Sequence, residues 1–367
     1  MKYEIAKPDL TGNEKKYLVE AIDKNEVSWH GKFCDLFEQG FAERHGKKYG
    51  VGTTSGTTAL ALAVAALSIG EGDEVIVPEF TMVATPWAVT YNKATPVFVD
   101  CNDELLIDVA KIEEKITPKT KAIIPVHIFG RQADMDAVMK IAAKHNLRVI
   151  EDAALAHGLE PKGDIACYAF FANKIMTSGE GGICITDNPY LEERLRYLKN
   201  MAFDPNHTFL HKELGFNYRL TNFQAAILCA QLERLDEFLE KRAQIESWYN
   251  EALKDIKEVT IMPKRNMLWM YDLLVPEDKK DALMAYLKEN GIDTRHYFKP
   301  MSMQPMYYNG KHPAVINRDY EKLNAYKFSQ QGFYLPTYVS LTKEDVQYIA
   351  KVVSDFFAAA DATADHL

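Results

Sequence analysis

The sequence has no excess of basic residues and no long apolar run, and each absence excludes a class of protein. Lys and Arg number 43 against 52 Asp and Glu, which gives a net charge of −9, whereas a nucleic-acid-binding surface needs a basic excess. The longest apolar stretch, residues 59–67, is too short to cross a bilayer. The first residues lack the pattern of a signal peptide. We therefore expect a cytoplasmic protein that binds neither nucleic acid nor membrane.

Metal-binding and redox motifs are also missing. The five cysteines form no C-x-x-C pair, and the histidines show no spacing of the H-E-x-x-H kind. We therefore expect no metal site and small thiols in a reducing compartment.

Between residues 50 and 190, short β-branched runs alternate with helical patterns. The predicted strands are residues 74–77, 96–100, 122–126, 149–152, 165–171 and 182–186, and the predicted helices between them are residues 57–67, 108–115 and 134–145. Such alternation predicts an α/β fold with a mainly parallel sheet. Ligands in these sheets bind beyond the carboxyl ends of the strands, so the loops there are the place to look for chemistry.

The remaining sequence predicts a smaller α+β lobe. A long amphipathic helix over residues 222–249 leads into it, followed by a strand at residues 268–275 and helices at residues 279–290 and 343–357. We expect a large domain over residues 1–245 and a small domain over residues 246–367.

Four segments matter together, and three of them carry candidate chemistry. Ser55-Gly56-Thr57 begins an Ala/Leu-rich helix, where free N–H groups suit a phosphate; alone, an ordinary helix cap explains it equally well. Asp152 ends a hydrophobic strand, where its carboxylate can pair with a cationic ring nitrogen beside the small Ala154. An acid exposed to solvent is the plain alternative.

The third segment contains Lys174, between an aromatic strand end and the glycine-rich turn at residues 177–182. Most lysines lie on solvated faces, but in a pocket the pKa of its amine would fall and make it a nucleophile. A fourth segment, residues 215–222, combines polar and aromatic side chains in a loop before the long helix.

In this order, the segments resemble the DegT/DnrJ/EryC1/StrS family of nucleotide-sugar aminotransferases, which depend on pyridoxal phosphate (PLP). The resemblance covers nearly the whole chain and includes residues 12–14, 72–78 and 125–130 besides the segments of Asp152 and Lys174. Residues 201–206 and 215–222 are most similar to GDP-perosamine synthases, which aminate C4 of a GDP-linked 4-keto-6-deoxymannose.

The resemblance implies PLP fold type I, with a mainly parallel seven-stranded sheet in the large domain. It implies that Lys174 forms the Schiff base with PLP, that Asp152 pairs with the pyridine nitrogen and that Ser55, Gly56 and Thr57 cradle the phosphate. Asn217 matches a residue that reaches the phosphate of the neighbouring subunit. It also implies a homodimer with shared sites, L-glutamate as amino donor and a nucleotide-linked keto sugar as acceptor.

Four positions depart from the family pattern. Met82 stands where members commonly have an aromatic that stacks on the cofactor, and Leu155 replaces a polar residue. Ala169 replaces a serine that helps to bind phosphate. Ser302 replaces a histidine of the substrate segment and is a candidate substrate contact.

His30 and Lys299 are further candidates for contacting the anionic substrate, although a solvated role explains them equally well. The alternatives left open are a 3-amino transferase, a UDP- or dTDP-linked sugar, and a PLP-binding regulator without turnover. The presence of Lys174 argues against the dehydratases of this family, which have histidine there.

Overall fold

The computed structural model describes residues 1–204, 206, 208–263 and 265–364, with the backbone alone for residues 360–364. Part of the segment 201–206 singled out in the sequence, at position 205, lies outside the described residues. None of the described helices is long and apolar enough to cross a membrane.

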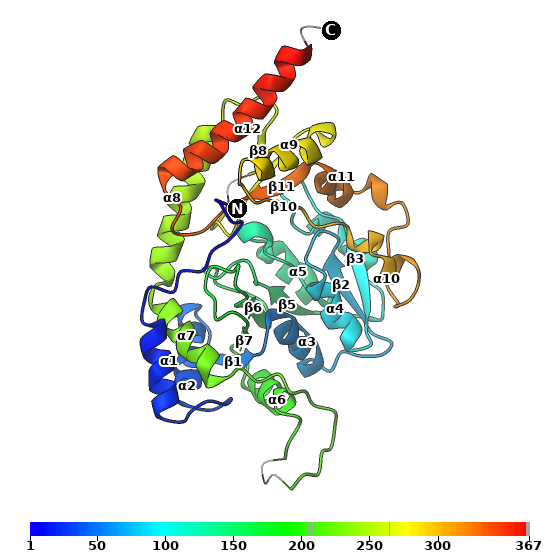
Figure 1. The fold of residues 1–367 in the computed structure, drawn as a ribbon. Coiled ribbons are helices and arrows are strands. Elements are labelled where there is room, and N and C mark those ends of the chain that lie inside the picture. The colour runs from blue at the N-terminus through cyan, green and yellow to red at the C-terminus, as the bar shows by residue number, and fades with distance from the viewer. Residues whose placement is uncertain (205, 207, 264, 365–367) are drawn as a thin grey trace.

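A seven-stranded sheet forms the centre of the larger part of the molecule (Figure 1). Its strands, in sheet order, are β1 (Tyr49–Thr53), β7 (Gly182–Thr186), β6 (Ile165–Ala169), β5 (Arg148–Asp152), β4 (Thr120–Ile123), β2 (Glu74–Pro78) and β3 (Thr95–Val99). The five strands from β6 to β3 are parallel, and β7 is antiparallel to both of its neighbours. The predicted α/β fold with a mainly parallel sheet is confirmed.

Both faces of the sheet are buried. Ile76 packs into one hydrophobic core, while its neighbours Val75 and Val77 pack into another, as the alternation of side chains along a strand requires. The helices of this part are α1 (Glu14–Asp23), α2 (Lys32–Arg44), α3 (Gly56–Ala66), α4 (Ala84–Tyr91), α5 (Met135–His145), α6 (Pro189–Lys199) and α7 (Asn222–Glu233). The predicted helix over residues 108–115 is wrong, because this segment forms two short 3-10 turns, Val109–Lys111 and Glu113–Lys115.

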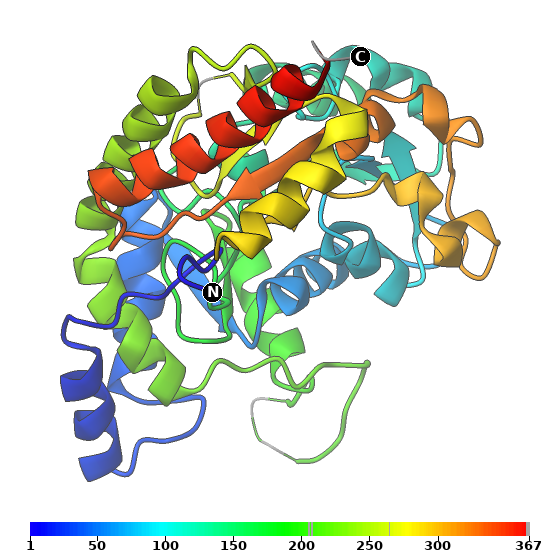
Figure 2. The same ribbon diagram turned by 45° about the horizontal axis from the view of Figure 1, so that its top comes forward.

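The smaller part contains a four-stranded antiparallel sheet with its own core. Its strands, in sheet order, are β10 (Arg295–His296), β11 (Gly332–Leu335), β9 (Tyr271–Leu274) and β8 (Thr260–Ile261), and its helices are α8 (Leu235–Leu253), α9 (Glu277–Glu289), α10 (Pro305–Tyr308), α11 (Asn324–Gln331) and α12 (Lys343–Ala364). Helices α8 and α12 lie side by side (Figures 1 and 2). The predicted boundary after residue 245 falls inside α8, so the division there stays a prediction.

The single long helix predicted over residues 222–249 is two helices. Between α7 and α8 the backbone of Arg234 leaves helical geometry (φ −111°, ψ 8°). Its guanidinium group is held by Asp9 and Glu237. Leucines continue at helical spacing across this break, so periodicity alone does not reveal it.

The connection between α6 and α7 projects from the body of the molecule (Figures 1 and 2). Among its described residues, Phe209 (78%), Leu210 (67%) and Leu214 (91%) are exposed apolar side chains. Exposed apolar side chains gathered on one segment are typical of a surface that contacts another protein.

Candidate active site

A cavity of about 360 Å³ lies between the large sheet and the smaller part of the molecule. It is placed at the carboxyl ends of β5 and β6 and at the N-terminus of α3, the location expected of a ligand site in such a sheet. All three chemical segments predicted from the sequence reach it: Ser55-Gly56-Thr57, Asp152 with Ala154, and Lys174.

The N-terminus of α3 offers an anion site. Ser55 caps the helix by accepting a hydrogen bond from the N–H of Thr58, and the Thr58 hydroxyl in turn accepts from the Ser55 N–H. The N–H groups of Gly56 and Thr57 donate to no described residue and belong to the positive end of the helix dipole. These features fit the phosphate of PLP.

Gly56 is required by close packing as well. A Cβ atom at this position would lie 2.4 Å from the Cβ of Ala169 on β6. Ala169 lines the cavity where it packs against the helix start.

Asp152 is buried at the end of β5. One carboxyl oxygen accepts a hydrogen bond from the Thr85 hydroxyl at 2.7 Å, and the other accepts from the Ala154 N–H at 3.2 Å. Burial raises the pKa of Asp152, and these hydrogen bonds offset part of the increase. A buried carboxyl group held at fixed orientation suits the cationic ring nitrogen of PLP, which would stabilise its ionised form.

Lys174 lies in the turn after β6 and is partly buried. Burial lowers the pKa of its amine to about 8, and the charge of Asp152 opposes that decrease. The Nζ atom lies 5.0 Å from the centre of the Trp269 ring. Lys174 is thus an amine with a large neutral fraction near pH 8, which is the state a nucleophile needs.

Trp269, from the smaller part of the molecule, also lines the cavity. Its indole N–H donates to the backbone oxygen of Asn173 at 2.9 Å, and its ring stacks on Phe129 with a centroid distance of 5.7 Å. Trp269 therefore covers Lys174 from the side of the smaller part. Nothing in the local sequence signals this role, which depends on packing between distant segments.

Two buried histidines support the site without facing it. His127 Nε2 donates to Glu151 at 2.8 Å, and its Nδ1 accepts from the N–H of Ala133. His157 Nε2 donates to the backbone oxygen of Ala169, and burial lowers its pKa to about 3.

Met82 and Leu155 both line the cavity, and the Met82 side chain is 53% exposed. With Phe298 and Trp269 they make much of the wall apolar. Besides the side chains at the helix start, Asp152 and Lys174, the polar residues that line the cavity are Thr81, Asn173, Glu180 and Tyr334.

The other predicted residues do not reach this cavity within the chain. Asn217 pairs with Asn200 in an isolated bridge and accepts a hydrogen bond from Arg219. His30 is exposed and stacks on Trp29. Lys299 is partly buried and lies outside the cavity wall.

Ser302 requires a correction, because it is fully buried rather than facing a ligand. Its hydroxyl donates to Glu79 and accepts from the N–H of Asn317, and its own N–H donates to Glu79 at 2.8 Å. The residue joins the segment after Pro300 to the end of β2, and we do not propose it as a substrate contact.

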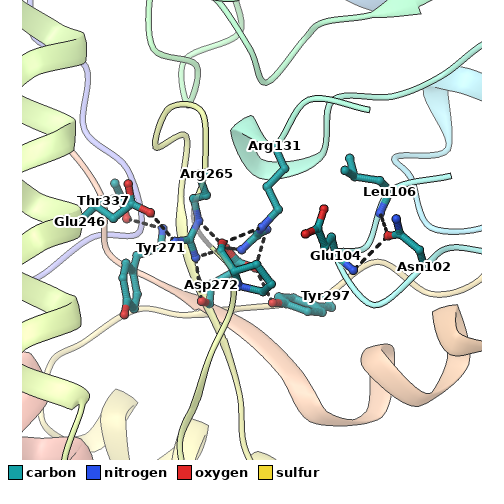
Figure 3. Close-up of polar contacts among 11 residues, drawn as sticks. Asn102, Glu104, Leu106, Arg131, Glu246, Arg265, Tyr271, Asp272, Tyr297 and Thr337 are labelled. Carbon is teal, nitrogen blue, oxygen red and sulfur yellow. Dashed lines mark hydrogen bonds and ion pairs between the residues drawn. The ribbon is translucent and has the colours of Figure 1, made fainter. Parts of the chain in front are cut away.

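A buried ion-pair cluster fastens the smaller part to the larger one (Figure 3). Asp272 on β9 accepts two hydrogen bonds from Arg131, at 3.0 and 3.1 Å, and further ones from Arg265 and the Tyr297 hydroxyl. Burial alone would raise the pKa of Asp272, but the two guanidinium groups outweigh it and lower the pKa. Because Trp269 lies three residues before Asp272, the cluster also fixes the cover over Lys174.

Comparison with known proteins gives one family over nearly the whole chain. The model of the DegT/DnrJ/EryC1/StrS aminotransferase family matches residues 8–354. The GDP-perosamine synthases of Caulobacter vibrioides and Escherichia coli O157:H7 are 40% and 37% identical, covering 94% and 98% of this chain and 95% and 100% of theirs. The UDP-N-acetyl-3-dehydro-alpha-D-glucosamine 3-aminotransferase of Acidithiobacillus ferrooxidans is 39% identical and covers 84% of both chains.

Solved structures of similar proteins agree with this family assignment. DesV of S. venezuelae superposes with a TM-score of 0.86 at 30% identity, covering 94% of each chain. 3-Amino-5-hydroxybenzoic acid synthase gives a TM-score of 0.88 at 27% identity, covering 97% of this chain and 99% of its own. NtdA of Bacillus subtilis, solved with the bound cofactor PMP, gives 0.83 at 27%, covering 96% and 87%.

Proposed function

Since the chain belongs to the DegT/DnrJ/EryC1/StrS aminotransferase family and is a PLP-dependent aminotransferase, we propose that it aminates a nucleotide-linked 4-keto-6-deoxy sugar with L-glutamate as donor. The observation that supports this best is the meeting of Lys174 and Asp152 in one cavity beside the N-terminus of α3. A cytoplasmic location is part of the same proposal.

Each of these groups has a role in the proposed reaction. When bound, PLP withdraws electrons from the bond that breaks and carries the amino group between the two substrates. Asp152 keeps the ring nitrogen positive, and the N–H groups of Gly56 and Thr57 hold the phosphate. Lys174 Nζ would hold the cofactor and, once the donor replaces it there, would take the proton from the donor α-carbon. The donor leaves as 2-oxoglutarate, and the same steps in reverse aminate the sugar.

The proposed acceptor is GDP-4-keto-6-deoxymannose, and the product is GDP-perosamine. The support is the 40% and 37% identity to two GDP-perosamine synthases over almost the full length of the chain. The test is incubation of the PLP-loaded enzyme with L-glutamate and this keto sugar, followed by mass spectrometry of the sugar nucleotide. Absence of the amino sugar would contradict the assignment.

A second candidate is a 3-amino transferase or an enzyme for a UDP- or dTDP-linked sugar. The 39% identity to a UDP-sugar 3-aminotransferase favours it. The same assay with UDP- and dTDP-linked 3-keto and 4-keto sugars distinguishes the candidates, because only the true acceptor gives an amino sugar at low enzyme concentration.

We further propose a homodimer in which Asn217 completes the partner subunit's site. Asn217 lies outside its own cavity, on the projecting connection that exposes Phe209, Leu210 and Leu214. A mixture of Lys174→Ala and Asn217→Ala subunits should then recover activity, because one site of the mixed dimer retains both residues. If the mixture stays as inactive as each variant alone, sharing is excluded.

A further inference from the structure

A second cavity of about 250 Å³ lies directly beside the one that contains Lys174. Phe171, Asn173 and Tyr334 line both cavities. The rest of the wall of this open cavity comes from Ile5, Ala6, Pro8, Ala172, Met270 and the exposed Arg295. A ligand that approaches Lys174 can therefore extend past these shared side chains into a second space of defined size.

Arg295 is the only charged residue among the described residues that line this second cavity. Its Nη1 donates to Asp293 Oδ1 at 2.6 Å and to the Thr294 oxygen at 3.0 Å. These bonds fix the guanidinium group, whose Nε and Nη2 donate to no described residue. Arg295 is paired in register with Tyr334 across β10 and β11, so both side chains belong to a rigid sheet.

The wall shared by the two cavities contains polar groups that have no hydrogen-bond partner among the described residues. The side-chain oxygen of Asn173 is buried and accepts no hydrogen bond from any described residue. A buried acceptor without a partner is unusual and points to a donor that is supplied from outside the chain. The Tyr334 hydroxyl also has no described partner, and burial raises its pKa to about 12, so it remains a neutral donor.

We propose that the second cavity binds the side-chain carboxylate of the amino donor, with Arg295 as its ionic partner. This assignment rests on the proposed function. A guanidinium group pairs with a carboxylate through two parallel hydrogen bonds, and the Tyr334 hydroxyl donates to the same group. The Asn173 oxygen accepts from the donor's amino group, which must reach the neighbouring Lys174. Arg295 already pairs with Asp293 through Nη1, so its Nε and Nη2 suit one further carboxylate better than a diphosphate.

The test uses Arg295→Gln in the PLP-loaded enzyme and follows the first half-reaction by the change in cofactor absorbance. The L-glutamate concentration for half-maximal rate should rise about tenfold or more, as expected for a lost charged hydrogen bond, while the rate at saturation changes little. L-Glutamine, the neutral analogue, should show no such rise. The control is Arg148→Gln. Arg148 is an exposed arginine at the start of β5, the end of the strand that lies away from the cavity, and it pairs with Asp164.

Three results would overturn this subsite. They are an unchanged response to L-glutamate, an equal loss for L-glutamate and L-glutamine, or weaker binding of GDP with L-glutamate unaffected. The last would show that Arg295 contacts the diphosphate. A wild-type enzyme that does not react with L-glutamate at all would contradict the proposed function itself, which separates the two failures. Arg295→Lys should restore part of the L-glutamate affinity.

Discussion

Two side chains in one cavity are shifted towards their neutral forms by the same cause. Burial lowers the pKa of Lys174 to about 8 and raises the pKa of Asp152. Each group is therefore poised for a charged or reactive partner that the chain itself does not supply. Opposite shifts of an acid and a base in one cavity are characteristic of a catalytic site.

The shift of Lys174 predicts how PLP attachment depends on pH. Only the neutral amine attacks the aldehyde, so below pH 8 the attachment rate should fall about tenfold per pH unit and above pH 8 it should level off. Stopped-flow mixing of apoprotein with PLP measures the rate. A rate that still rises tenfold per unit above pH 9 would show that the lysine keeps its ordinary pKa of 10.5.

Replacement of Asp152 by Asn tests the charge of this side chain without changing its size. The amide has the same size but cannot hold the ring nitrogen positive, so kcat should fall by about a hundredfold or more. Thr85→Val removes one hydrogen bond to the carboxylate and should reduce kcat by only about threefold to tenfold. Steady-state rates with saturating substrates check both values, and equal effects would argue against a charge-based role.

At the residue scale, the sequence predicts the groups that approach the cofactor because they lie in short ordered segments. It does not predict that Trp269 and Tyr334 line the cavity or that Thr85 binds Asp152, because these residues come from distant parts of the chain. Ser302 is misinterpreted for the same reason, since the partner of its hydroxyl, Glu79, lies more than 200 residues away.

At the element scale, the packing of α3 against β6 sets the cofactor site. Gly56→Ala would place a Cβ atom 2.4 Å from that of Ala169 and should lower the free energy of unfolding by about 1–3 kcal/mol. The displaced helix start should also weaken PLP binding. Urea unfolding and PLP titration measure the two effects.

Gly70→Ala is the matched control. The nearest atom to a Cβ there is the Asn92 oxygen at 3.6 Å, an ordinary contact, so stability and PLP affinity should change little. If Gly56→Ala behaves like this control, the close approach does not govern the site.

Helices and strands are predicted well where the hydrophobic pattern is regular, and poorly where side-chain hydrogen bonds determine the backbone conformation. The six predicted strands of the large sheet begin within two residues of the observed ones, because continuous apolar runs are typical of buried parallel strands. The prediction over residues 122–126 runs three residues past the end of β4 at Ile123. The break at Arg234 and the 3-10 turns after Asp108 depend on side-chain hydrogen bonds, which periodicity does not contain.

At the scale of the whole molecule, Asp272 should contribute strongly to stability. Asp272→Asn leaves the buried Arg131 without its counter-charge and leaves Arg265 with Glu246 as its one remaining ion-pair partner among the described residues (Figure 3), and should lower the free energy of unfolding by about 3–5 kcal/mol. Asp236→Asn, which removes an exposed ion pair with Arg44, should cost less than about 1 kcal/mol. Equal losses in urea unfolding would contradict a central role for the cluster.

The most direct measurement is the site of covalent PLP attachment. Borohydride reduction of the PLP-loaded enzyme, followed by protease digestion and mass spectrometry, should place the cofactor on the peptide that contains Lys174, and Lys174→Ala should carry none. A cofactor bound to a different lysine, or the same labelling in Lys174→Ala, would contradict the assignment of this active site.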